Sequence, residues 1–122
     1  MLISGNGKKV TQKRAWVGDG ALSYLTRRFL LERYPCMNSM KSMDKRFKAM
    51  TCNQFLNKYA RTSGLAVGCN TMEAYIAQVM ERSVQEAYDL ISDMYFQCNV
   101  IQQMDKNENL NTLLGARYCR WW

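Results

Sequence analysis

Apolar residues recur at helical spacing over most of the chain, and this pattern predicts an all-α protein. In the first long segment they stand at Val17, Ala21, Leu22, Leu25, Phe29 and Leu30. Thr11 is a suitable N-cap for this helix. We expect the helix to end near Tyr34, because Pro35 disfavours helical geometry at the residue before it.

Two further helices are predicted between residues 36 and 64. The segment CMNSMKSMDKRFKAM is methionine-rich, basic and irregular, so we expect only a short helix in it, from about Asp44 to Ala49. The segment TCNQFLNKYARTSG predicts a clearer helix, with Thr51 as its N-cap and Gly64 as its stop signal. Its apolar stripe consists of Phe55, Leu56 and Tyr59.

The segment after Gly64 predicts one long helix or two helices in near continuity. Asn70 or Thr71 would cap it. Its apolar positions are Ala74, Ile76, Val79, Met80, Val84, Ala87, Leu90, Ile91 and Met94. The pattern breaks in CNVIQQMDKNEN, and LNTLLGARYCRWW predicts a short last helix. Together these elements predict a single all-α domain over residues 1–122, with residues 1–10 flexible.

Positive charge is concentrated in the first half of the chain. Residues 1–63 contain 13 Lys or Arg and 3 Asp or Glu, whereas residues 64–122 contain 4 and 7. A basic half of this strength is typical of proteins that bind a polyanion such as a nucleic acid or an anionic membrane. Ordinary solubilising charge is the alternative.

The chain contains no histidine, and this excludes the usual zinc sites and His-dependent nucleophilic catalysis. The five cysteines are widely spaced without a C-x-x-C pair, so we expect reduced, structural thiols and a cytoplasmic protein. No secretory signal or membrane-spanning apolar run is present, so no membrane partner is expected. The basic, acid-free start MLISGNGKKVTQKR leaves a mitochondrial or other organellar location open.

Two acids lie within apolar helical segments: Asp19, between Gly18 and Gly20, and Glu73. Most other acids are expected on solvated faces: Glu81, Glu86, Asp89, Asp93, Asp105 and Glu108. A lone acid in such a segment is commonly exposed or paired with an arginine. If the two helices pack together, Mg²⁺ between the carboxylates would relieve their repulsion and support hydrolysis of a phosphodiester. We expect the two glycines to keep bulk away from Asp19.

Three segments in order resemble the ribonuclease III catalytic domain. AWVGDGALSYL resembles the family's first signature, a helix that carries GD. MTCNQFLNKYA resembles its SN-x-x-L helix, and TMEAYIAQVMER resembles its second signature. The resemblance implies an all-α helical bundle that forms a homodimer and cuts double-stranded or structured RNA with Mg²⁺, or with Mn²⁺ as a substitute. The chain is most similar to the small Mini-III branch, which lacks a double-stranded-RNA-binding domain.

The resemblance also implies roles for particular residues. Asp19 and Glu73 match the catalytic acids that bind the metal. Bacterial members have two further acids, where this chain has Ala15 and Asn70. Asn70 could still offer the metal a neutral oxygen, so it is the third expected ligand. Phosphate contacts are expected from six basic residues, since RNA duplexes are read mainly through shape and backbone: Lys8, Lys9, Lys13, Arg14, Arg27 and Arg28.

Two other functions stay open. The changes at Ala15 and Asn70 are compatible with a catalytically inactive RNA-binding scaffold, for example a subunit of a ribosome, organellar ones included, or of a processing complex. Alternatively, the nine methionines could form the adaptable surface of a helical protein-interaction module. The aromatic end of the chain is expected to pack on the protein in preference to stacking on bases; it comprises Tyr118, Trp121 and Trp122.

Overall fold

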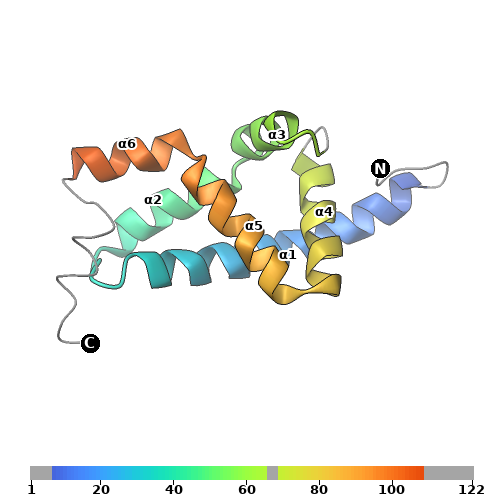
Figure 1. Ribbon diagram of the computed structural model, residues 1–122, viewed down its shortest axis with the longest axis horizontal. Helices are drawn as coiled ribbons and strands as arrows, with labels where there is room; N and C mark the ends of the chain where they lie inside the picture. The colour runs from blue at the N-terminus through green and yellow to red at the C-terminus, as the bar shows by residue number, and fades with distance from the viewer. Residues whose placement is uncertain (1–6, 66–68, 109–122) are drawn as a thin grey trace.

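The computed structural model describes residues 7–65 and 69–108, which form six α-helices and their connections (Figure 1). The helices are α1 (Gly7–Arg33), α2 (Met40–Thr51), α3 (Asn53–Thr62), α4 (Cys69–Arg82), α5 (Val84–Phe96) and α6 (Asn99–Asn107). The described residues contain no strand, so the predicted all-α class is confirmed.

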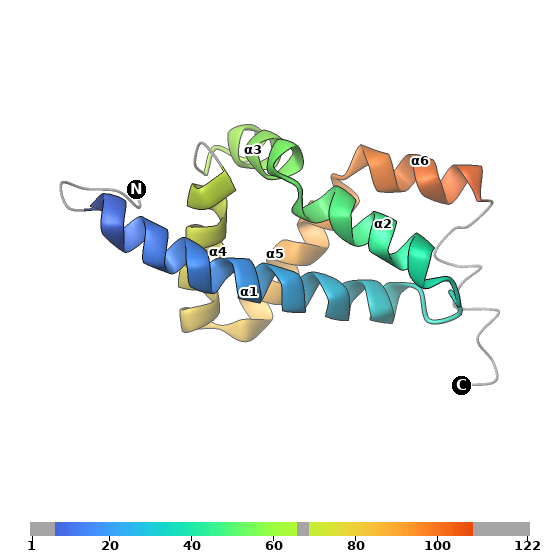
Figure 2. The same ribbon diagram turned by 180° about the vertical axis from the view of Figure 1, so that it is seen from behind.

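The long helix α1 is the element on which the others are arranged. It runs along the length of the molecule, and α4 and α5 both lie on one side of it in the two opposite views (Figures 1 and 2). The contact between α1 and α4 is the most extensive helix–helix contact in the described part of the chain. It brings together the two helices that carry Asp19 and Glu73.

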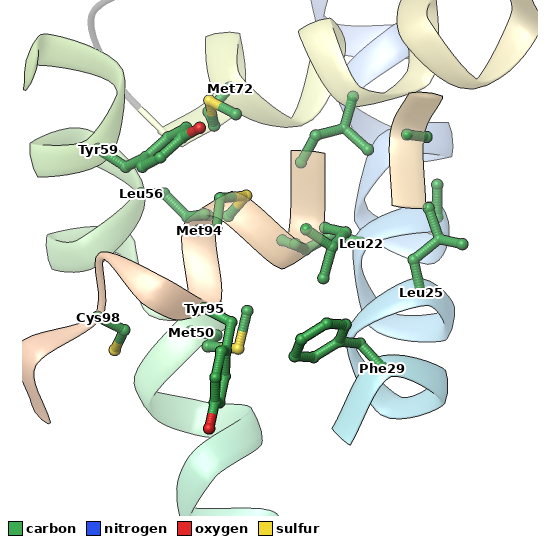
Figure 3. Close-up of a cluster of buried hydrophobic side chains, with 14 of the residues drawn as sticks. Leu22, Leu25, Phe29, Met50, Leu56, Tyr59, Met72, Met94, Tyr95 and Cys98 are labelled. Atoms are coloured by element: carbon green, nitrogen blue, oxygen red, sulfur yellow. The ribbon is translucent and has the colours of Figure 1, made fainter. Parts of the chain in front are cut away.

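The hydrophobic core draws on all six helices, with α1 contributing a full stripe (Figure 3). Three of its fully buried side chains are methionines, Met50, Met72 and Met94. Methionine is unbranched and fills irregular gaps between helices. These methionines therefore serve packing within the chain, which weakens the alternative of a methionine-rich interaction surface.

The first helix extends beyond its predicted start. It begins at Gly7 and not near Thr11, so the predicted start is wrong by four residues, and the flexible stretch predicted over residues 1–10 lies partly outside the described residues. It ends at Arg33, one residue before the predicted limit, which agrees with the constraint from Pro35.

The second helix is twice as long as the predicted segment from Asp44 to Ala49. It begins at Met40, because the hydroxyl of Ser39 caps it by accepting a hydrogen bond from the backbone N–H of Ser42 at 3.1 Å. Its last residue is Thr51, so the prediction that Thr51 caps the next helix is wrong. Cys52 takes that position without a side-chain hydrogen bond.

The structure confirms the stop signal at Gly64, and it shows which of the two alternatives for the long apolar segment is right. Gly64 adopts φ 67° just after α3, a left-handed conformation that glycine adopts without strain. The long apolar segment forms two helices, α4 and α5. They separate at Ser83, whose hydroxyl accepts a hydrogen bond from the backbone N–H of Glu86 at 3.2 Å.

The break predicted in residues 98–109 is wrong, because most of this segment forms α6. Two residues of this helix are buried, Ile101 and Asp105, and Asp105, expected on a solvated face, is only 6% exposed. Its carboxylate accepts hydrogen bonds from Nη2 of Arg46 at 2.9 Å and from the hydroxyl of Tyr34 at 2.7 Å. These contacts hold α6 against α2 and the end of α1. The helix predicted in residues 110–122 lies outside the described residues.

The cysteines differ from one another. Cys52 is an exposed free thiol and Cys98 is a buried one, but Cys36 is disulfide-bonded. The prediction of reduced thiols is therefore wrong for Cys36. Among the described residues, no helix is long and apolar enough to cross a membrane.

Candidate functional site

Asp19 and Glu73 line the same pocket between α1 and α4. Its lining residues are Gln12, Ala15, Trp16, Asp19 and Glu73, and its volume is about 230 Å³. Asp19 is exposed, whereas the side chain of Glu73 is partly buried. The two acids that the sequence singles out therefore come from two different helices and line one pocket.

Gly18 explains why the two helices lie so close at this point. A Cβ atom placed on Gly18 would lie 1.8 Å from the backbone oxygen of Glu73 and 2.5 Å from its carbonyl carbon. No side chain fits there, so glycine is required by the contact between the two backbones. A Cβ on Gly20 would meet nothing within 4 Å. Gly18 is therefore required for the approach of α4, whereas Gly20 faces open space; the expectation that both glycines keep bulk away from Asp19 stays a prediction.

The carboxyl group of Glu73 has an unusual proton affinity. Burial, a hydrogen bond with the Asp19 carboxyl and the charge of Asp19, in that order of size, together raise its pKa from 4.5 to about 7. Two carboxylates this close repel one another unless a proton or a cation lies between them. Without a cation, a proton on Glu73 relieves this repulsion below about pH 7.

Asp19 and Glu73 are the carboxylates among the residues that line the pocket, and Gln12 adds a neutral amide oxygen to the lining. Ala15, where the resemblance places a third acid, lies in the pocket wall, and no group of three or more His, Cys, Asp or Glu occurs within the described residues. Asn70 belongs to the first turn of α4, but its side chain lies outside the described residues. Two carboxylates fit Mg²⁺, which keeps several water ligands and is commonly held by one or two acids together with a substrate phosphate.

The six basic residues predicted to contact RNA have different surroundings. Arg14 lies 3.9 Å from Glu81, and Arg28 lies 3.8 Å from Glu32. Exposed pairs of this kind contribute little stability and leave both arginines able to exchange partners. The side chains of Lys8 and Lys9 lie outside the described residues.

Lys13 and Arg27 differ from the paired arginines. Both are exposed, and neither is in an ion pair with any acid among the described residues. The guanidinium of Arg27 lies 4.2 Å from the centre of the Phe47 ring, which fixes its position at the surface. Among the described side chains of α1, Lys13 and Arg27 are the exposed cations without an acidic partner.

Trp16 is a pocket residue that the apolar pattern did not indicate. Its side chain is 82% exposed, although it shares the pocket with both acids. The signal for it in the sequence is spacing: Trp16 precedes Asp19 by three residues, and residues three apart share one face of a helix. If Asp19 faces solvent, the ring of Trp16 on the same helix face is expected to face solvent as well.

Comparisons with known proteins do not assign the chain to a family. No protein-family model, no curated protein and no solved structure matches the chain. The resemblance to ribonuclease III consequently depends on the three sequence segments, and the pocket of Asp19 and Glu73 is described here on its own geometry.

Proposed function

We propose that this protein is a Mg²⁺-dependent endoribonuclease whose catalytic residues are Asp19 and Glu73. The observation that carries the proposal is the meeting of these two carboxyl groups in one solvent-open pocket between α1 and α4. A chain gains no stability from forcing two acids together, so the arrangement favours a role for a bound cation. Hydrolysis of RNA is the chemistry that fits a cation site next to a basic helix.

Within this proposal the two acids hold the cation, and the protein supplies the rest of the geometry. A Mg²⁺ ion at the site would lower the pKa of a bound water and stabilise negative charge on the phosphodiester. Asp19 is exposed and meets solvent and substrate, whereas Glu73 is partly buried and held in place by α4. Gly18 sets the distance between them. Asn70 remains the proposed neutral ligand.

The basic residues of α1 belong to the same proposal. Phosphate groups of a double-stranded or structured RNA would be neutralised by Lys13 and Arg27, and by Arg14 and Arg28 after exchange of their acidic partners. Such contacts weaken steeply as salt rises. The resemblance adds a homodimer, because ribonuclease III proteins generally cut the two strands of a duplex with two subunits.

The test is cleavage of a long structured RNA at low salt. Wild type, Asp19→Asn and Glu73→Gln are compared in Mg²⁺, in Ca²⁺ and in EDTA. Ser23→Ala, also on α1 but outside the pocket, is the matched control. We expect cleavage in Mg²⁺ by wild type and the control, at least a hundredfold loss in each acid variant, and none in EDTA. Cleavage that survives in EDTA or in both acid variants would contradict the proposal.

A second candidate is an RNA-binding scaffold without catalysis. It is favoured by the donor set, because the pocket has an alanine where bacterial members of the family have a further acid. Wild type that binds structured RNA at low salt without cutting it in Mg²⁺ or Mn²⁺ would support the scaffold. Equal RNA affinity of wild type and Asp19→Asn would then show that the pocket takes no part in binding.

A further inference from the structure

The outward face of α1 carries an unusual combination of side chains. Lys13, Trp16, Gly20, Tyr24 and Arg27 follow one another at spacings of three or four residues, so they lie on one face of the helix. All five are exposed. The buried residues of α1, among them Leu22, Leu25 and Phe29, stand at other positions of the helix. Helices α4 and α5 lie behind α1 in Figure 2.

Two large aromatic rings dominate this face. Trp16 is 82% exposed and Tyr24 is 62% exposed, and neither ring stacks on an aromatic or cationic side chain in the part of the chain that the structure describes. Their eight-residue separation corresponds to about 12 Å along the helix axis. Exposed aromatic rings next to basic residues are the feature on which proteins stack the bases of single-stranded nucleic acids.

Gly20 lies between the two rings and leaves the surface open there. A Cβ at Gly20 would meet nothing within 4 Å. The packing of this chain therefore gives no reason for a glycine, although glycine in a helix interior costs about 1 kcal/mol relative to alanine. An absent side chain between Trp16 and Tyr24 lets a flat ligand lie close to the helix backbone.

The charge of the face indicates which ligand it fits. Lys13 and Arg27 flank the two rings, and neither has an acidic partner among the described residues. Asp19 is the only acid of α1 between them, and it lies in the adjoining pocket. A polyanion with exposed flat rings satisfies both the cations and the aromatic side chains, which describes a single nucleic-acid strand.

We propose that this face of α1 binds an unpaired RNA strand, with bases stacked on Trp16 and Tyr24 and phosphates near Lys13 and Arg27. The inference rests on the proposed function and names its substrate class: RNA with a single-stranded segment beside the cleaved bond. Trp16 lines the pocket of the two acids, so a base stacked on it places its phosphate next to them. A duplex cannot use this face in the same way, because its bases are stacked on each other.

The test measures binding in EDTA, where no cleavage takes place. A labelled unpaired oligoribonucleotide of about 12 residues and the same sequence in a duplex are titrated with wild type, Trp16→Ala, Trp16→Phe and Tyr24→Ala. Phe96→Ala removes an aromatic ring of similar exposure from α5 and is the matched control. Thermal unfolding of each variant establishes that it is folded.

We expect Trp16→Ala and Tyr24→Ala each to weaken binding of the unpaired strand by about 5- to 150-fold, the range for loss of one stacking ring. Binding of the duplex should change less than about twofold, and Trp16→Phe and Phe96→Ala should resemble wild type. The proposal is overturned if wild type does not bind the unpaired strand, if both RNAs lose affinity equally, or if Phe96→Ala has the same effect. A change of oligomeric mass in Trp16→Ala with unchanged RNA affinity also overturns it and indicates a protein interface.

The two proposals fail separately. If wild type never cuts RNA but Trp16→Ala loses the unpaired strand, the nuclease is wrong and the strand-binding face stands. If wild type cuts in Mg²⁺ and Trp16→Ala binds like wild type, the face is wrong and the nuclease stands.

Discussion

The backbone of Gly18 lies directly against the backbone of Glu73, so close that a Cβ on the glycine would fall 1.8 Å from the glutamate oxygen. The contact has two consequences. It fixes how closely α1 and α4 pack, and it carries the carboxyl group of Glu73 to that of Asp19, the next residue along α1. Packing of the fold and assembly of the pocket thus depend on the same glycine.

Replacing this glycine should separate the two helices. We expect Gly18→Ala to lower the free energy of unfolding by about 2 kcal/mol or more, because the obstructing atoms belong to the backbone and cannot rotate away. The measurement is urea denaturation followed by circular dichroism. Gly20→Ala is the internal control and should raise the free energy of unfolding by about 0.5–1 kcal/mol through helix propensity. Equal effects of the two substitutions would contradict the described contact.

The raised pKa of Glu73 should be visible as a pH dependence of stability. Because the pKa of Glu73 is about 7 in the folded protein against an ordinary 4.5, the folded state binds this proton more tightly than the unfolded state. Its stabilising contribution is complete below about pH 4.5 and is lost as the pH rises through about 7. Glu73→Gln keeps a hydrogen-bonding side chain but cannot titrate.

The experiment compares thermal unfolding of wild type and Glu73→Gln in EDTA at about pH 4.5 and about pH 8. All other groups titrate in both proteins, so the difference between them isolates Glu73. We expect the Tm of wild type to fall relative to that of Glu73→Gln at the higher pH. A constant difference across this range would mean that Glu73 titrates as in an unfolded chain.

The sequence pattern was sufficient to predict the helical class and to single out Asp19 and Glu73 as unusual acids. The signals for the helices are short-range ones. Apolar spacing, the signal at Gly64 and the restriction before Pro35 act within one turn of helix. The pairing of Asp19 with Glu73 could be anticipated only as a consequence of helix packing. The chain does carry a cue for that packing in Gly18, but a glycine required by a neighbour and one open to solvent look alike in sequence.

The predictions failed where contacts with residues distant in the sequence decide the structure. The segment that forms α6 has weak apolar periodicity, and its position is set by Asp105, whose partners Tyr34 and Arg46 lie about 60 to 70 residues earlier in the chain. Such an acid is indistinguishable in sequence from a solvated one. The same holds for Trp16, whose exposure depends on which face of α1 is covered by α4.

The buried ion pair should be among the most sensitive points of the fold. Arg46 is fully buried, and its Nη2 donates to Asp105 at 2.9 Å. We expect Arg46→Met to lower the free energy of unfolding by about 3–5 kcal/mol, because it leaves the carboxylate buried without its cation. Lys48→Met, which removes an exposed pair with Asp44 in the same helix, should cost less than about 1 kcal/mol.

A double substitution distinguishes loss of the charge pair from loss of packing. In Arg46→Met with Asp105→Leu no charge stays buried, so the double variant should be more stable than Arg46→Met alone. Chemical denaturation of the three variants gives the comparison. A double variant that is less stable than the single one would mean that packing around Arg46, and not its charge, holds α6 in place.

The pocket should accept a third acid at Ala15. This residue lies in the pocket wall and precedes Asp19 by four residues, so a longer side chain there shares the helix face of the acid. We expect Ala15→Glu to strengthen Mg²⁺ binding, because a further carboxylate raises the charge of the donor set. In EDTA the same variant should be less stable than wild type, since three acids then repel one another.

Thermal unfolding with and without saturating Mg²⁺ measures both effects, because an ion that binds the folded state raises the Tm. We expect a larger Mg²⁺-induced rise in Ala15→Glu than in wild type. Ala15→Gln adds the same bulk without charge and should behave like wild type towards the metal. Adding Asp19→Asn to Ala15→Glu should remove most of the rise. If the rise instead persists without Asp19, the bound ion lies elsewhere, and the pair of carboxyls in this pocket is held together by its proton alone.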